Sequence, residues 1–184
     1  MTESVPTVAV LSSSPALVSI LGATLRSRRD WRVREFRDAR SLNAYMRIAP
    51  VAMLVSDFTF EDGNLATLAQ AIRNDEMVIS KHVQIIALSR TVSPRMRREC
   101  VTAGIDEVIV KPMSPIYLKE RIGARIAKGP TDHIVVKDSY FGPERRGRIP
   151  MRDHREIPVE RRGDNVVSFA AHRVQRGIET RPEA

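Results

Sequence analysis

The sequence has few residues of several types, and each shortage excludes particular structural features or functions. Among its 184 residues there is one cysteine, Cys100, so an internal disulfide cannot form and a structural zinc site is not expected. Cys100 lies among apolar residues at helical spacing, which predicts a buried thiol. No apolar run reaches about 18 residues and no signal-peptide pattern begins the chain, so we expect a cytoplasmic protein without a membrane span.

Motifs that carry enzyme chemistry are also missing. The sequence has no glycine-rich phosphate loop and no nucleophile elbow, and its four histidines lack the spacing of metal ligands. We therefore do not expect an enzyme. Aromatic residues make up only 5% of the chain and no helix-turn-helix pattern occurs in its last third, so nucleic acid ranks low among the expected partners.

The length and the net charge of the chain indicate its domain size and the kind of surface it has. A chain of 184 residues, 42% of them hydrophobic, fits one ordinary domain and an appendage. The net charge of +8 predicts a surface that attracts anions. Seven basic residues lie close together in the first quarter of the chain: Arg26, Arg28, Arg29, Arg32, Arg34, Arg37 and Arg40. They fit either a solvated rim around a strand or an anion-binding face.

Short apolar runs alternate with segments of helical period as far as about residue 127. This pattern is typical of a parallel sheet with helices on both faces. The predicted strands are Thr7–Leu11, Trp31–Phe36, Met53–Ser56, Val83–Leu88 and Glu107–Val110, and the predicted helices are Pro15–Arg28, Ser41–Arg47, Leu65–Asn74, Pro94–Ala103 and Ser114–Ala127. The expected fold class is α/β, a doubly wound five-stranded parallel sheet, with the second and fifth strands more exposed.

The pattern changes after Lys128, where large apolar residues become scarce and prolines, glycines and alternating charges increase. We predict a domain over residues 1–128 and a largely disordered, arginine-rich tail over 129–184. A short apolar island at Asn165–Val174 could order on a partner. The tail residues that could capture a ligand are Arg145, Arg146, Arg148, Arg152, Arg161 and Arg162, although the acids between them equally fit a solvated tail.

In an open parallel sheet, functional groups gather where the strands end. Asp57 ends the third predicted strand, Ser89 ends the fourth, and Lys111 follows the fifth. A carboxylate beside a buried strand needs a compensating cation, and Lys111 is a natural partner for Asp57. Ser89 could donate to an oxygen of a phosphorylated Asp57, or bond ordinary backbone. These residues predict either a phosphoryl site or a fixed ion pair.

This order of residues, from about Val5 to Ile126, resembles the receiver domains of two-component response regulators, the chemotaxis type included. The resemblance implies a flavodoxin-like fold and a stand-alone receiver in a phosphorelay. Asp57 would accept a phosphoryl group from a histidine kinase or phosphotransfer protein, while Ser89 and Lys111 would contact the phosphate. A downstream protein target is implied, and a homodimer stays open. Val108 stands where the family usually has an aromatic switch residue, so that relay is in doubt.

A second departure from the family concerns magnesium. Ser12 and Ser13 replace the acidic pair that normally follows the first strand, leaving Asp57 as the remaining carboxylate of the metal site. Binding of Mg2+ is expected to be much weakened, and phosphorylation of Asp57 to be slow or absent. Glu61 and Asp62 could replace part of the lost charge.

The competing hypothesis is an adaptor or nucleotide-binding module that works through the basic tail. Arg148 and Arg152 have the Arg-x-x-x-Arg spacing found in PilZ domains, whose guanidinium groups grip cyclic-di-GMP. The tail is too short for the PilZ barrel. Truncation after Pro130 would separate the two hypotheses.

Overall fold

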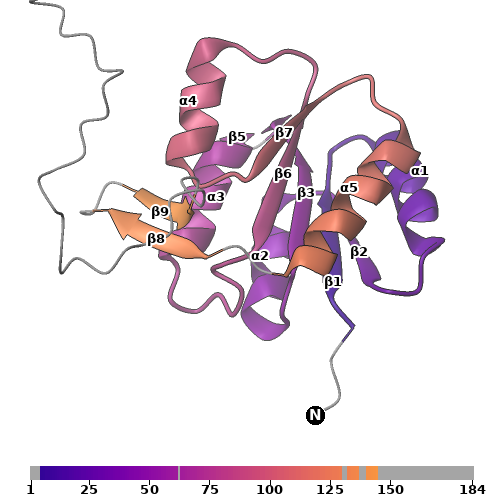
Figure 1. Ribbon diagram of the computed structural model, residues 1–184, viewed down its shortest axis with the longest axis horizontal. Helices are drawn as coiled ribbons and strands as arrows, with labels where there is room; N and C mark the ends of the chain where they lie inside the picture. The colour runs from indigo at the N-terminus through magenta and orange to yellow at the C-terminus, as the bar shows by residue number, and fades with distance from the viewer. Residues whose placement is uncertain (1–4, 62, 130–131, 137–139, 145–184) are drawn as a thin grey trace, which may run out of the picture. The chain divides into compact units, whose positions relative to one another are not determined.

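A computed structural model describes residues 5–61, 63–129, 132–136 and 140–144. Its centre is one parallel sheet in the order β2-β1-β3-β6-β7 (Figure 1). The strands are β1 (Thr7–Leu11), β2 (Arg32–Phe36), β3 (Met53–Asp57), β6 (Gln84–Ser89) and β7 (Glu107–Val110). All neighbouring strands in this sheet run parallel. The predicted doubly wound five-stranded fold is confirmed, with each strand within a residue or two of its expected bounds.

Five helices connect these strands: α1 (Pro15–Arg26), α2 (Ala39–Ile48), α3 (Leu65–Asn74), α4 (Pro94–Thr102) and α5 (Pro115–Lys128). Three of them begin with a serine followed by a proline. The hydroxyls of Ser14, Ser93 and Ser114 each accept a backbone N–H of the first turn, which satisfies a donor that the helix itself cannot. In the described part of the chain, no helix has the length and apolar content to cross a membrane.

The core has two layers, one on each face of the sheet. Helices α2, α3 and α4 cover one face, and α1 and α5 cover the other (Figure 1). Successive strand side chains point to opposite faces, so Leu54 of β3 joins the first layer and Val55 the second. Cys100 of α4 is only 3% exposed, which confirms the predicted buried thiol.

The sheet centre and edges differ in burial as the sequence predicts. Every residue of β1 and β3 is buried, because both strands are covered by helices and flanked by other strands. The edge strand β2 has no buried residue, and β7 has one, Ile109. The two edges are therefore where polar side chains and backbone groups remain accessible.

Two short hairpins were not predicted. The first joins β4 (Thr59–Phe60) to β5 (Gly63–Asn64) directly after β3. The second joins β8 (His133–Val136) to β9 (Tyr140–Pro143). These eight residues lie within the segment predicted to be largely disordered from residue 129, and they form strands. The remaining tail from residue 145 onward, with its six arginines and the apolar island, lies outside the described residues.

Contacts with the rest of the domain explain why the second hairpin forms. The ring of Phe141 lies 5.4 Å from that of His82, and β9 also contacts α3 and α4. Gly104 adopts φ +70°, and a Cβ there would lie 2.7 Å from the Phe141 carbonyl oxygen and 3.0 Å from Gly142 Cα. Two glycines thus allow the backbones to meet closely. Such long-range packing leaves no local signal in a segment this short.

Candidate functional site

Asp57 ends β3 at the carboxyl edge of the sheet, where it is only 7% exposed. The neighbouring strands bring three predicted residues to the same edge: Ser12 follows β1, Ser89 ends β6 and Lys111 follows β7. A pocket of about 600 Å3 lies at this edge, and Asp57, Ser89 and Lys111 line it together with Ser13. The residues expected to form a site do converge.

Both carboxylate oxygens of Asp57 accept hydrogen bonds from side chains. Lys111 Nζ donates to Oδ1 at 2.6 Å, and Ser12 Oγ donates to Oδ2 at 2.6 Å. The ammonium compensates the charge that burial makes unfavourable, and hydrogen bonds to a charged group are the stronger kind. The structure thus contains the Asp57–Lys111 ion pair predicted as one of two alternatives.

Ser12 is fixed in its orientation by a second contact. Its side chain is almost completely buried, and while it donates to Asp57 it accepts the backbone N–H of Ser14 at 3.1 Å. Its backbone N–H donates to the carbonyl of Phe36 at 3.2 Å. From the sequence, Ser12 is predicted only as a lost acid, whereas its hydroxyl is a direct partner of Asp57. The signal in the sequence that could have predicted this contact is a small hydroxyl residue directly after β1, the strand next to β3.

Ser89 and Val108 take positions that do not connect them to Asp57. The Ser89 hydroxyl donates to the carbonyl of Thr91 at 2.7 Å, in its own loop. Val108 of β7 is half-buried and packs against the core layer beneath α4. Ser13, the next residue after Ser12, is exposed and lines the pocket. Of the hydroxyl residues predicted here, only Ser12 is hydrogen-bonded to Asp57.

The residues at this edge do not fit the magnesium site of receiver domains, which typically bind Mg2+ in an acidic pocket. Within the described ranges, no three His, Cys, Asp or Glu side chains gather closely enough to hold a metal. Mg2+ prefers several oxygen ligands in near-octahedral geometry, whereas Asp57 is the single acid among the described residues that line this pocket. Glu61 is exposed in the turn after β4, and Asp62 lies outside the described residues.

A second charged cluster ties α5 to β7. Burial raises the pKa of Glu107, but hydrogen bonds from Arg121 and Arg125 outweigh it, so the pKa of this carboxyl is lowered overall. Arg121 Nε donates to Glu107 at 3.0 Å and Arg125 Nε at 2.8 Å. This cluster fixes helix α5 against the sheet edge.

Arg73 near the end of α3 is the buried arginine of the described chain. Burial lowers its pKa to about 10, against the opposing effects of Asp106 and Tyr140. Its guanidinium donates to the carbonyls of Val83 at 2.7 Å and Gly104 at 3.2 Å. These carbonyls belong to loops around α3 and α4, so Arg73 holds the loops that the β8–β9 hairpin covers.

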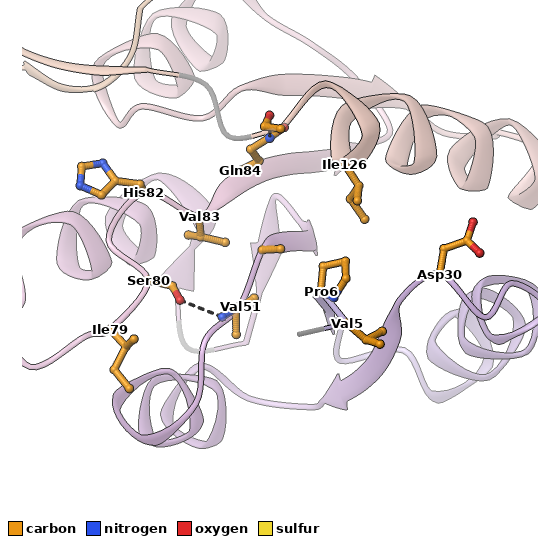
Figure 2. Close-up of a pocket in the computed structure, with 12 residues that line it drawn as sticks. Val5, Pro6, Asp30, Val51, Ile79, Ser80, His82, Val83, Gln84 and Ile126 are labelled. Atoms are coloured by element: carbon orange, nitrogen blue, oxygen red, sulfur yellow. Dashed lines mark hydrogen bonds between the residues drawn. The ribbon is translucent and has the colours of Figure 1, made fainter. Parts of the chain in front are cut away.

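A larger pocket of about 720 Å3 lies at the opposite, amino end of the sheet. Figure 2 shows that Pro6, Val83 and Ile126 surround it, and that Ser80 accepts the backbone N–H of Val51 at 2.8 Å. Its titratable residues, Asp30 and His82, lie at opposite sides of the view. The lining is mostly apolar and brings no acid, base or nucleophile together.

Comparisons with known proteins agree with this architecture. The family model of the response regulator receiver domain matches residues 8–123. The chemotaxis protein CheY4 of Vibrio cholerae shares 21% identity, with 66% of this chain and 98% of that chain covered and a TM-score of 0.60. A receiver domain protein from Methanospirillum hungatei JF-1 shares 17%, covering 68% and 96% with a TM-score of 0.61. A response regulator receiver protein from Pseudomonas putida shares 18%, covering 67% and 100% with a TM-score of 0.60.

A comparison with curated proteins finds no match. At identities near 20% the solved structures bear on the fold alone, whereas the family match spans most of the domain. It runs from β1 into α5 and includes Asp57, Ser89 and Lys111. The chain belongs to the response regulator receiver domain family of two-component signalling.

Proposed function

We propose that the protein is an atypical receiver, a pseudo-receiver of a two-component phosphorelay, which signals through protein contacts while Asp57 stays in a fixed ion pair. The observation that carries this proposal is the double engagement of Asp57 by Lys111 and Ser12. The fold and the position of Asp57 are those of a receiver. The negative charge of Asp57 is already compensated within the protein, by the ammonium of Lys111 and the hydroxyl of Ser12.

Forming an acyl phosphate would disturb this arrangement. One carboxylate oxygen of Asp57 would become a bridging oxygen and a poor acceptor, which weakens its hydrogen bond to Lys111 or to Ser12. Phosphoryl transfer also needs positive charge around the transferring group, which metal ions supply in most phosphotransfer proteins. With serines in place of the acidic pair, Lys111 is the cation at hand, and it is bound to the acceptor itself.

The proposed partners are proteins, as for receiver domains in general, which interact with histidine kinases and downstream targets. A histidine kinase or phosphotransfer protein would bind upstream and a second protein downstream, both recognising a surface that does not depend on phosphate at Asp57. A homodimer stays a prediction that measurement of the molar mass in solution would test.

Labelling with acetyl phosphate and Mg2+ tests the proposal. The wild-type chain is compared with the double variant Ser12→Asp/Ser13→Asp, which restores the acidic pair, and with that variant carrying Asp57→Asn. We expect the double variant to be labelled at least about tenfold more than wild type, because it regains metal ligands, and Asp57→Asn to remove the gain. Equal labelling of wild type and double variant at Asp57 would refute the proposal.

A further inference from the structure

The segment from Arg26 to Arg40 concentrates the positive charge of the chain. It holds seven arginines against three acids, a surplus of four charges, which is half of the net +8. The segment ends α1, forms the edge strand β2 and begins α2. The charge therefore lies along one edge of the sheet.

The three acids of this segment are engaged with particular partners. Glu35 pairs with Arg26, and Asp30 accepts from Arg28 Nε at 2.9 Å. Asp38 caps α2, where hydrogen bonds from Ser41 lower the pKa of its carboxyl. None of these acids is left to neutralise the arginines of β2.

Three arginines at β2 form what we call the β2 strip: Arg32, Arg34 and Arg37. All three are exposed, and among the residues that the structure describes none of them has an ion-pair partner. Arg32 and Arg34 alternate with Val33 along the strand, so their side chains leave the same face of the sheet about 6.8 Å apart. That face is the one on which Phe36 packs beneath α2.

The backbone beside the β2 strip is also unpaired on its outer side. Arg32 N–H donates to the Pro6 carbonyl at 2.8 Å, so its backbone faces β1. The backbone groups of Val33 and Glu35 must then point away from the sheet, because direction alternates along a strand. No strand in the described ranges pairs with this edge (Figure 1). An open edge of this kind can bind an extended peptide.

We propose that the outer edge of β2 binds an extended acidic segment of a partner protein. The segment would pair with the backbone of Val33 and Glu35 and place carboxylates at alternate positions opposite Arg32 and Arg34. Side chains directly opposite in paired strands lie about 4.5–5.5 Å apart at Cβ, within reach of an arginine–carboxylate pair. Arg37, one residue beyond the strand, would meet a third acid.

The charge and the open backbone of this edge favour an acidic segment over two other binding partners, a second copy of the chain and nucleic acid. A second copy of the chain pairing edge to edge would place arginines opposite arginines, which is destabilising. Nucleic acid lacks strand backbone to pair with Val33 and Glu35, and single strands bind through stacking on aromatic side chains. The two aromatic residues of this segment, Trp31 and Phe36, are buried and half-buried in the core, and Tyr45 of α2 packs on the ring of Phe36. An acidic strand uses both the charges and the backbone groups that the edge offers.

The test uses the full chain and a synthetic peptide in which glutamate alternates with threonine and valine. Its control is a peptide of the same composition with all glutamates in one block. We expect the alternating peptide to bind at least about tenfold more tightly, and Arg32→Glu/Arg34→Glu to weaken that binding at least about tenfold. The matched variant Arg97→Glu/Arg98→Glu makes the same charge change on α4, at exposed positions, and should bind like wild type.

A second set of measurements tests the backbone pairing of the peptide with β2 separately from its charge. Hydrogen exchange at the Val33 and Glu35 amides should slow when the alternating peptide binds, and N-methylation of its pairing amides should abolish binding. Equal binding of the block or N-methylated peptide would overturn the proposal, as would equal losses in the two double variants. So would a short DNA duplex that binds more tightly than the alternating peptide and loses this binding in Arg32→Glu/Arg34→Glu. None of these results depends on phosphorylation of Asp57.

Discussion

The hydroxyl of Ser12, the residue directly after β1, donates a 2.6 Å hydrogen bond to Oδ2 of Asp57. A carboxylate at position 12 would repel Asp57 unless a cation lay between them. A serine needs no such cation, because it is itself a donor. The carboxylate of Asp57 is therefore stabilised by a hydroxyl at one oxygen and by the ammonium of Lys111 at the other.

Removing the Ser12 hydroxyl should destabilise the domain. Ser12→Ala leaves Oδ2 of a buried carboxylate without its donor, and we expect a loss of about 1.5–3 kcal/mol in the free energy of unfolding. Urea denaturation measures this loss. Ser13→Ala is the control, because Ser13 is exposed and should change the stability by about 0.5 kcal/mol or less. Equal effects of the two substitutions would contradict the structural role of Ser12.

Removing the ammonium of Lys111 should also destabilise the domain. Lys111→Met leaves Asp57 charged and nearly buried, and the loss in such cases is roughly 3–5 kcal/mol. We expect about 2–3 kcal/mol, because the Lys111 side chain is 26% exposed and solvent screens part of the charge. Asp57→Asn in the Lys111→Met background should recover much of the loss, as measured by urea denaturation. A double variant no more stable than Lys111→Met would show that the two residues are not coupled.

The cluster of Glu107 with Arg121 and Arg125 should make stability depend on pH. Because the folded-state pKa of Glu107 lies below its ordinary value of 4.5, its contribution is present above pH 4.5 and is lost as the pH falls through the folded-state pKa. Glu107→Gln should cost roughly 0.5–1 kcal/mol at pH 7, a modest value because Arg121 is partly exposed, and less near pH 3. Unfolding curves at both pH values measure the difference. Glu120→Gln makes the same change of side chain at an exposed position of α5 and is the matched control.

The close approach of Gly104 to the β8–β9 hairpin should be sensitive to a single methyl group. Gly104→Ala places Cβ 2.7 Å from the Phe141 carbonyl oxygen, so the hairpin must shift. Gly129→Ala is the matched control, because Gly129 also has a positive φ, of +80°, but nothing lies within 4 Å of its Cβ. We expect Gly104→Ala to lose at least about 1 kcal/mol more, with faster hydrogen exchange of the hairpin amides. Equal losses would mean that backbone strain alone decides the effect.

Truncation separates the hairpin from the tail. A chain ending at Glu144 keeps β8 and β9 and should unfold at the same urea concentration as the full chain, whereas one ending at Pro130 should be less stable. Calorimetric titration of the Glu144-ended and full chains with cyclic-di-GMP tests the competing hypothesis built on Arg148 and Arg152. Heat from the full chain alone would support nucleotide binding by the tail, and no heat from either would end that hypothesis.

The strands and the grouping of candidate site residues were predictable because both follow from local sequence. A strand covered on both faces is mainly apolar, so β1, β3 and β6 appear as short apolar runs with polar residues at their ends. The carboxyl ends of parallel strands share one edge, so Asp57 and Lys111 were expected to meet. The hairpin was missed because its apolar residues are few and their partners lie far away in the sequence.

The sequence by itself determined the α/β fold and the receiver family, since these depend on residue order and periodicity. Only the tertiary structure decided which donors Asp57 bonds: Ser12 turns toward it, whereas Ser89 bonds to Thr91 in its own loop. It also decided which arginines remain unpaired along β2. The direction of a hydroxyl and the partner of a charge depend on atoms brought together by folding, and residue order does not encode them locally.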